Sequence, residues 1–415
     1  MKKKVCHIKR KSSLLILISI FFSILILGAC GSASESGTQS FPSDSSSSSK
    51  SQKDTSDVIE ITFWSQREEL YADYIAEFEK LHPHIKVNAQ HVGSNYDEMA
   101  QRVMAAAVAD NLPHVVQMGQ RHGIAQVADS GRLVPIEKFM SEEEMNDVLP
   151  AFWERFTYKG SKWTIPFESS TPVLYYNKTR FDEKGLQPPR TWDELVEVAK
   201  QLTDHEAGIW GFNTAEDIPW YVQPMVWNRG GKIIDAEGNV TIKTPQFVDT
   251  LQSFHDLYHL HKVMPPNQLA SSSEDFVQGR LAMMFRSGAS LRSIKEQVGD
   301  AFEVGVAFLP AVDSRNVPIG GNSLGIFKSD EKTERAAWEF VKFMTSAEKT
   351  AQRSIETGYI PIRQSAYELD FFVEHLEKDP DFKVAIDQTA YLKGQSINPA
   401  DGVIWLGIAE VMEKL

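Results

Sequence analysis

Residues 165–178 read IPFESSTPVLYYNK, and they stand where a pattern of strands and helices begins for the second time. Within this run, Val173–Tyr176 is a short apolar segment and predicts a strand. Pro166 marks the point after which the pattern resumes. The chain therefore contains two successive blocks of alternating strands and helices.

The first block lies on the amino-terminal side of this run. Its apolar residues repeat at strand or helix spacing, and Pro83 ends the first helix. The predicted strands are Val58–Trp64, Ile85–Val92 and His114–Met118, and the predicted helices are Leu70–Leu81 and Asp97–Asp110. Alternation of this kind implies an α/β fold in which helices flank a mainly parallel sheet on both faces.

The second block continues to the end of the chain. Trp192–Leu202 and Phe247–Leu260 predict helices, and Leu281–Phe285 predicts a buried strand. Ala336–Met344 and Gly402–Lys414 predict amphipathic helices near the end. No internal sequence repeat accompanies this second block.

The first residues of the chain predict export. Six basic residues precede the apolar run Leu14–Leu27, which would span only about 21 Å as a helix, short of the roughly 30 Å that a bilayer core requires. A basic stub, a short apolar run and the small residues Gly28 and Ala29 are typical of a secretory signal. Cys30 then resembles the acceptor cysteine of a bacterial lipobox, which implies cleavage before Cys30 and a lipid on its thiol. The alternatives are an uncleaved anchor helix or an ordinary signal with a chance cysteine.

Residues 31–57 are nearly all small or polar and include the serine run Ser45–Ser49. Such a composition cannot bury enough surface to offset its conformational entropy, so we expect a flexible tether. About 358 residues follow, which suits two lobes. Loss of the six basic residues changes the formal net charge from −13 to −19, which argues against nucleic acid as a partner. The part after the tether has no cysteine, so it forms no disulfide and no thiolate metal site.

An ordered set of short motifs connects the chain to a known family. Together with residues 165–178, the set comprises Phe63-Trp64, His82-Pro83, Asn111–Gln117, Pro189–Leu195, Gly279–Met283, Ile319–Leu324 and Thr357–Pro361. This set resembles the extracellular solute-binding proteins of ABC importers, in the sugar-binding family, and within it the glycerol-3-phosphate-binding proteins. The resemblance covers nearly the whole chain after the tether.

The resemblance implies a two-lobed, periplasmic-binding-protein-like fold of type II with the ligand in the cleft between the lobes. By analogy, residues 58–166 and 306–345 form the amino-terminal lobe. Residues 167–305 and 346–415 form the carboxyl-terminal lobe. Because open α/β sheets bind ligands at the carboxyl ends of their strands, loops after strands should line the cleft.

The resemblance also implies the ligand contacts, which match this chain one position at a time. The implied residues are Tyr96, Gln120, Ser169 or Ser170, Trp220, Ser287, Gly321 and Tyr359. Gln120 replaces an acidic residue of the glycerol-phosphate proteins, and an amide donates as well as accepts. The family arginine for the phosphate falls within Asn398–Asp401, which has none, and Asp401 would repel a phosphate. A phosphate ligand is therefore in doubt on sequence grounds.

Several patterns have a plain structural interpretation beside a functional one. Ser287 is either a ligand contact or an ordinary helix cap. Trp220 is either a sugar-stacking ring or a core residue, and we interpret Trp227 as core. His255 and His259 share one helix face with Zn-like spacing, but a third ligand is lacking, so no metal is predicted. Gly321–Gly325 fits the G-x-S-x-G pattern of a hydrolase, yet a strand follows where that turn needs a helix.

The sequence thus predicts a binding protein without a catalytic site or cofactor. We expect a lipid-anchored monomer on the outer face of the cytoplasmic membrane, which delivers a small polyhydroxylated solute to permease subunits. The chain has no P-loop, so the ATPase must be another chain. Two alternatives remain open at this point: an exported hydrolase of glycans, and a partner that presents ligand to a membrane sensor.

Overall fold

The computed structural model describes residues 58–119, 123–214, 218–235, 237–265 and 271–415. The predicted signal, the tether, Cys30 and Gln120 lie outside these ranges. Within them, no helix combines the length and the apolar character that crossing a bilayer requires. All the elements below belong to one compact unit.

The first sheet is mixed in direction. Its strands run in the order β2-β1-β3-β13-β4, and β7 also pairs with β13. β1 is parallel to β2 and β3, whereas β13 is antiparallel to β3, β4 and β7. The strands are β1 (Ile59–Ser65), β2 (Ile85–His91), β3 (Val115–Gly119), β4 (Leu133–Val134), β7 (Ile165–Ser170) and β13 (Gly320–Phe327).

The second sheet has the order β11-β8-β10-β9. Its central strand β8 is antiparallel to β10 and β11, and β9 is parallel to β10. The strands are β8 (Pro172–Asn177), β9 (Asn213–Thr214), β10 (Met283–Ser287) and β11 (Val304–Ala307). Two small ladders join β5 (Thr157–Tyr158) to β6 (Ser161–Lys162), and β12 (Val317–Pro318) to β14 (Leu392–Lys393).

Helices pack on both sheets. Those connected with the first sheet are α1 (Ala72–Leu81), α2 (Tyr96–Ala109), α3 (Ile124–Asp129), α4 (Glu142–Asp147), α5 (Pro150–Phe156) and α12 (Glu331–Met344). Those connected with the second are α6 (Lys178–Lys184), α7 (Trp192–Leu202), α8 (Ile218–Asn228), α9 (Pro245–His259), α10 (Ser272–Val277), α11 (Leu291–Val298) and α16 (Asp401–Met412). Three more helices lie between α12 and α16 in the chain: α13 (Ala347–Thr357), α14 (Asp370–Lys378) and α15 (Pro380–Asp387).

Short 3-10 turns complete the described secondary structure. They are η1 (Glu68–Tyr71), η2 (Ile136–Lys138), η3 (Gly288–Ser290), η4 (Gln364–Glu368) and η5 (Gln388–Tyr391). Two of them matter for the site. η1 leads directly into α1, and η3 leads directly into α11.

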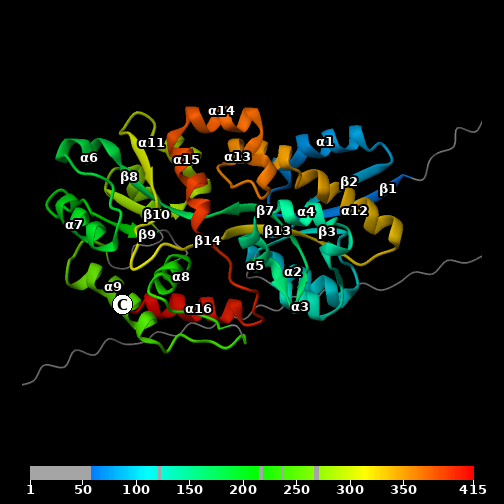
Figure 1. Ribbon diagram of the computed structural model, residues 1–415, viewed down its shortest axis with the longest axis horizontal. Helices are drawn as coiled ribbons and strands as arrows, with labels where there is room; N and C mark the ends of the chain where they lie inside the picture. The colour runs from blue at the N-terminus through cyan, green and yellow to red at the C-terminus, as the bar shows by residue number, and fades with distance from the viewer. Residues whose placement is uncertain (1–57, 120–122, 215–217, 236, 266–270) are drawn as a thin grey trace, which may run out of the picture. The chain divides into compact units, whose positions relative to one another are not determined.

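The run at residues 165–178 connects the two sheets. Its first half is β7 and its second half is β8, and Thr171 alone separates them. The chain returns from β11 to β13, and Gly320 there pairs with Ser170. In Figure 1, β7 lies between the strands of the first sheet at the right and those of the second at the left.

The structure confirms the predicted elements with small shifts of their ends, and it corrects two expectations. The sheets are not mainly parallel, because β13 and β8 return antiparallel to their neighbours. The last helix, α16, is not amphipathic either. Ile404 and Ile408 are buried as expected, but Val403 and Leu406 on the same helix are exposed.

The hydrophobic core is shared between the sheets. One cluster contains Ile61 and Leu324 from the first sheet together with Tyr175 and Met284 from the second. A second cluster lies mainly under α7, α8 and α9, and a third lies between α2, α3 and the first sheet. Residues on both sides of the junction between β7 and β8 therefore pack in one continuous apolar cluster.

Candidate functional site

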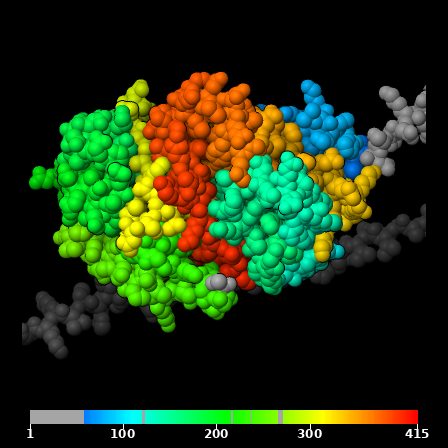
Figure 2. Space-filling view, in the orientation of Figure 1, coloured from blue at the N-terminus to red at the C-terminus, as the bar shows by residue number. Residues whose placement is uncertain are grey.

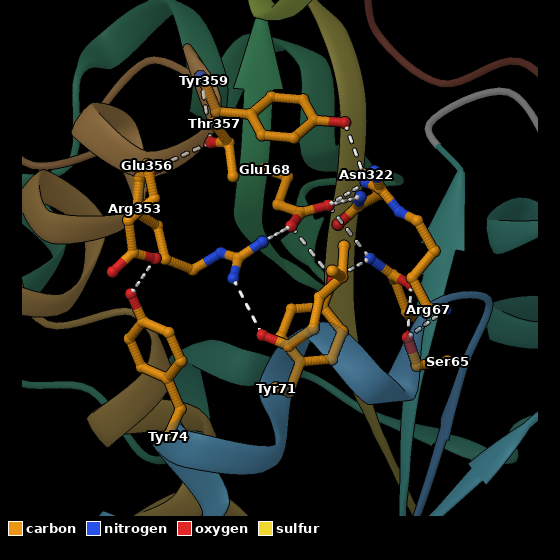
Figure 3. A network of polar contacts seen from close by, with 12 residues as sticks. Ser65, Arg67, Tyr71, Tyr74, Glu168, Asn322, Arg353, Glu356, Thr357 and Tyr359 are labelled. Carbon is orange, nitrogen blue, oxygen red and sulfur yellow. Dashed lines mark hydrogen bonds and ion pairs between the residues drawn. The ribbon is translucent and has the colours of Figure 1, made fainter. Parts of the chain in front are cut away.

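A buried carboxylate lies at the centre of the site. Glu168 on β7 is almost fully buried, and side chains from distant parts of the chain surround it (Figure 3). Its Oε2 accepts hydrogen bonds from Arg67 at 3.0 Å and from Asn322 at 3.0 Å. Its Oε1 accepts from Tyr71 at 3.0 Å and from Arg353. Buried charges are tolerated only when they are paired and hydrogen-bonded, and Glu168 meets that condition.

A second layer holds these partners in place. Gln117 on β3 donates to the Tyr71 hydroxyl at 2.9 Å and to Glu168 at 3.3 Å. The Gln117 carbonyl in turn accepts from the Ser65 hydroxyl at 2.9 Å, which fixes the direction of the amide. The Arg353 guanidinium carbon lies 4.8 Å from the centre of the Tyr71 ring. The network is therefore rigid on the side of β1, β3 and α13.

Two tyrosines lie at the edge of the network. The Tyr359 hydroxyl accepts a hydrogen bond from Arg67 at 3.1 Å, and the Tyr96 hydroxyl accepts one from Asn322 at 3.1 Å. Tyr96 is the first residue of α2, and Asn95 caps that helix by accepting from Glu98 N. Both tyrosines were implied by the family resemblance, and the structure brings them to one network.

Burial and charge keep the tyrosines protonated and the arginines charged. Burial, and then the Glu168 carboxylate, raise the pKa of Tyr359; burial, Tyr359 and Glu168 raise the pKa of Tyr96. Burial lowers the pKa of Arg67, but Tyr359 and Glu168 outweigh it, and the pKa stands above its ordinary value. Burial also lowers the pKa of Arg353, but Glu168 and Tyr71 together outweigh burial and raise this pKa above its ordinary value. The site therefore offers phenol and guanidinium donors at neutral pH.

Gly321 permits the close approach of β13 to β7. Its φ of +104° suits glycine, and a Cβ at this position would lie 1.8 Å from the Glu168 carbonyl oxygen. The pairing register shifts between Gly321 and Ser323. Ser169 pairs with Gly321, and its carbonyl accepts from Ile360 N at 2.7 Å. Gly321 thus allows the β7 to β13 contact that carries Glu168, Ser169 and Asn322.

The Ser287 loop approaches the Tyr359 loop. Ser287 ends β10 and caps η3, because its hydroxyl accepts from Ala289 N at 3.3 Å. Gly358, with a φ of +83°, packs so closely that a Cβ would lie 3.1 Å from the Gly288 carbonyl oxygen. Ser287 is therefore a cap and also a neighbour of the Tyr359 segment, so the two interpretations of this serine are compatible.

Trp220 and Trp227 lie in different surroundings. Trp220 packs against the connecting strands, since a Cβ on Gly320 would lie 2.4 Å from its ring and 2.9 Å from the Ser170 hydroxyl. Trp227, interpreted as core from the sequence, is buried but lines a groove, with the Lys393 ammonium 5.2 Å from its ring centre. Trp220 is thus the tryptophan that approaches Ser170.

Several buried polar atoms near the junction have no hydrogen-bond partner among the residues that the structure describes. They include the Ser169 hydroxyl, the Trp220 indole nitrogen and the Asn322 carbonyl oxygen. Unpaired buried polar groups cost free energy and require an explanation. A polar ligand that reaches the junction of β7, β8 and β13 would satisfy groups of this kind.

A separate groove has a volume of about 770 Å³. It is bounded by the β5 to β6 hairpin, by residues that follow α8, and by residues 393–400. Figure 2 shows the red residues near the end of the chain in the seam between the green and cyan segments. A small cavity lined by Arg155, Gln223 and Ile319 shares Trp227 and Lys393 with the groove.

Asp401, which the sequence led us to expect would repel a phosphate, is paired with a cation. Arg155 Nη1 lies 3.7 Å from Asp401 Oδ2, and both side chains are buried. Asp401 Oδ2 also accepts from Asn398 N at 3.0 Å, and Asp401 begins α16. A cation and a helix amino terminus therefore compensate this carboxylate. The expectation that Asp401 repels a phosphate is corrected accordingly.

Sequence reasoning missed the charged part of the network. Arg67, Glu168 and Arg353 are far apart in the chain, and no local motif connects them. One feature of the sequence could have indicated Glu168, since it is an acidic residue directly after the apolar residues Ile165–Phe167. The serine of the G-x-S-x-G pattern, Ser323, lies inside β13, and no helix follows it directly. The rings of His255 and His259 lie 4.5 Å apart on α9, and His259 bonds to the Leu415 carbonyl.

Comparisons with known proteins agree with this architecture. The family model for bacterial extracellular solute-binding proteins matches residues 73–384. The chain is 28% identical over 338 residues to the sn-glycerol-3-phosphate-binding periplasmic protein UgpB of Pectobacterium atrosepticum, with 75% of this chain and 74% of that protein covered. It is 29% identical over 357 residues to UgpB of Yersinia enterocolitica, with 80% of each chain covered.

Solved structures show the same fold. UgpB from Mycobacterium tuberculosis in complex with glycerophosphocholine superposes with a TM-score of 0.75 at 25% identity and covers 85% of this chain and 92% of its own. An ABC substrate-binding protein from Listeria monocytogenes in complex with cycloalternan superposes with a TM-score of 0.74 at 22% identity, over 86% and 93% of the two chains. The second likeness concerns the fold alone.

Proposed function

The chain belongs to the bacterial extracellular solute-binding protein family, and on that premise we propose that it is the substrate-binding protein of an ABC importer for a carbohydrate-type solute. The solute is a sugar, an oligosaccharide or a glycerol phosphate. The curated relatives support this class, because they bind sn-glycerol 3-phosphate by name, and the solved relatives hold glycerophosphocholine or a cyclic saccharide.

The observation that carries the proposal is the set of polar groups at the junction of the sheets. Tyr359 and Arg67 lie at the edge of the network, while Ser169 and Trp220 have polar atoms without a hydrogen-bond partner in the described ranges. Hydroxyl, indole and guanidinium donors beside an aromatic ring suit a polyhydroxylated ligand, whose hydroxyls both donate and accept. Glu168 accepts five hydrogen bonds from side chains of the protein, so its proposed role is to position donors.

The proposed mechanism is capture by closure of two lobes. We place the first lobe crossing at Thr171, a few residues after the boundary expected at residue 166, because β7 pairs within the first sheet. The second crossing lies between β11 and β13, and the third follows α12, as the resemblance implied. A ligand that contacts Tyr96 on one side and Ser287 or Trp220 on the other would favour the closed arrangement. Such differential binding is what shifts a two-state equilibrium, and the closed form is then recognised by a permease.

The proposed setting is the outer face of the cytoplasmic membrane. A lipid on Cys30 and a flexible tether would hold a monomer near its permease, with the ATPase supplied by another chain. Mass spectrometry of the native protein tests this directly. A mature chain that begins at an acylated Cys30 is expected, whereas an unmodified Cys30 or an intact signal would overturn the anchor.

A thermal-shift panel tests the ligand class. The full chain is expected to melt at a higher temperature with a member of a panel of maltose, maltotriose, glycerol 3-phosphate and glycerophosphocholine. A ligand at 100 times its Kd that binds only the native state stabilises it by about 2.7 kcal/mol. Absence of any shift across the panel would count against the proposal.

Variants of the site residues locate the binding event. Tyr359→Phe removes the hydroxyl at the network edge, and Ser287→Ala removes the hydroxyl of the facing loop. Each is expected to weaken the hit about 5- to 20-fold, as loss of one buried hydrogen bond does. Ser293→Ala on the exposed side of α11 is a matched control and should leave the affinity unchanged. Unchanged affinity in both site variants would show that the ligand binds elsewhere.

A further inference from the structure

The network around Glu168 carries one positive charge in excess. Across the described ranges, Glu168 is the one carboxylate that pairs with Arg67 or Arg353. Both guanidiniums stay charged, as their raised pKa values show. Two cations therefore surround a single anion in a largely buried place, where an uncompensated charge is costly.

The two arginines are not equivalent. The Arg353 side chain is 5% exposed, and it lies 5.5 Å from the Tyr74 ring centre and 5.8 Å from that of Phe167. The Arg67 side chain is 41% exposed, and its Nη2 serves both Glu168 and Tyr359. Arg67 Nε and Nη1 donate to no atom of the part of the chain that the structure describes. Arg67 is thus the guanidinium that still has donors to offer.

The other buried arginine near the junction provides no such charge. Arg155 lies beside the small cavity, but Asp401 at 3.7 Å compensates it and the Gln395 carbonyl accepts from it at 2.9 Å. The family position of the phosphate-binding arginine corresponds to residues near Asp401, and the sequence has no arginine there. The structure shows a cation at the opposite end of the chain, on the turn between β1 and η1.

We infer that the solute carries a negative group, a phosphate or a carboxylate on a polyol or sugar, and that Arg67 is the residue that selects it. The inference rests on the proposed function. The anion would take the free donors of Arg67, and Tyr359 would add its hydroxyl proton, since its oxygen already accepts from Arg67. A charge-assisted pair of this kind is about twice as strong as a neutral hydrogen bond.

Matched pairs of ligands test the inference. Calorimetry on the full chain would compare glycerol 3-phosphate with glycerol, glucose 1-phosphate with glucose, and glucuronate with glucose. For at least one pair, the anionic member is expected to bind about tenfold tighter or more. Arg67→Gln should weaken the anionic member more than the neutral member, so that the difference within the pair is lost, and Arg67→Lys should restore part of it.

Controls separate charge selection from folding. Arg292→Gln on α11 removes an exposed arginine and should leave every affinity unchanged. If Arg67→Gln proves unstable, the wild-type chain still answers the question, because affinity for the anionic member alone should fall from 20 to 200 mM salt. Neutral and anionic members that bind equally, or that respond equally to salt, would overturn the role of Arg67 and leave the proposed function standing. Binding of no member at all would overturn the proposed function itself.

Discussion

At the scale of single residues, backbone geometry and charge set the site in different ways. Gly321 matters because it has no side chain, since any side chain at its φ of +104° would overlap the Glu168 carbonyl. Glu168 matters because its two carboxylate oxygens accept hydrogen bonds from side chains of β13, η1 and α13 and so position these donors. A sequence motif can reveal the glycine, whereas the carboxylate has meaning only beside its partners.

Gly321→Ala should destabilise the protein by at least about 2 kcal/mol, because it combines backbone strain with a 1.8 Å overlap. Urea unfolding of the variant measures the change in the free energy of unfolding. Gly407→Ala is the matched control. Gly407 lies inside α16 with open space around it, so alanine there should be neutral or stabilise by up to about 1 kcal/mol. Equal effects at the two positions would contradict the role of Gly321.

Glu168→Gln should cost about 3–5 kcal/mol, because it leaves the buried Arg353 guanidinium without its counter-ion. Glu331→Gln breaks another Glu to Arg pair, with Arg335 on the exposed face of α12, and should cost less than about 0.5 kcal/mol. Thermal unfolding of both variants beside the wild type gives the comparison. A Glu168 variant as stable as the Glu331 variant would show that the network does not hold the fold.

At the scale of elements, most helices and strands follow from local patterns, but their directions do not. The apolar run Val173–Tyr176 lies within β8, and the alanine-rich segment Asp97–Asp110 lies largely within α2. A strand pattern spans only a few residues and says which face is buried. It does not say which strand becomes the neighbour, and so the antiparallel return of β13 against β3 was not predicted.

The junction of α4 and α12 makes stability depend on pH. Glu144 accepts from Ser141 N at 2.8 Å in a capping box and pairs with Lys342 of α12 at 2.6 Å. Burial opposes the charge of Glu144, but Lys342 and Ser141 outweigh it and lower the pKa of this carboxyl. The stability it contributes is therefore full above the ordinary pKa of about 4.3 and is lost as pH falls through the lower folded pKa.

Glu144→Gln should therefore be less stable than the wild type at pH 7, and the difference should shrink as the pH falls below about 4. Chemical unfolding between about pH 7 and pH 3 gives the two curves. Curves that stay parallel throughout this range would show that Glu144 does not contribute as described. As a companion, Ser141→Ala removes the other half of the capping box and should cost about 1 kcal/mol at pH 7.

At the scale of the whole molecule, the described part of the chain has two large sheets and a core that spans both. The cluster that includes Ile61 and Leu324 also includes Tyr175 and Met284. The chain passes from the first sheet to the second at Thr171, a link one residue long, and returns between β11 and β13. The sheets are therefore coupled in stability even if ligand changes their relative arrangement.

Differential scanning calorimetry should show one unfolding transition for the part that follows the tether. The shared apolar cluster makes separate unfolding of either sheet unfavourable, because it would expose the other half of the cluster to water. A calorimetric enthalpy equal to the van't Hoff enthalpy is the expected result. Two resolved transitions would contradict the coupling.

The local pattern of residues was enough for the element types, the export signal as a prediction, and the family. The family resemblance also implied Tyr96, Ser169, Gly321 and Tyr359, which the structure brings together around one network. Periodicity and short motifs extend over about ten residues, so they report what one segment does.

The charge network and the direction of the strands came from the tertiary structure alone. Arg67 and Glu168 are 101 residues apart, and Glu168 and Arg353 are 185 residues apart. Whether such groups meet depends on which distant segments pack together, and no segment carries that information alone. The excess positive charge beside Tyr359 is a property of that packing, and it reopens a charged solute that the sequence near Asp401 had placed in doubt.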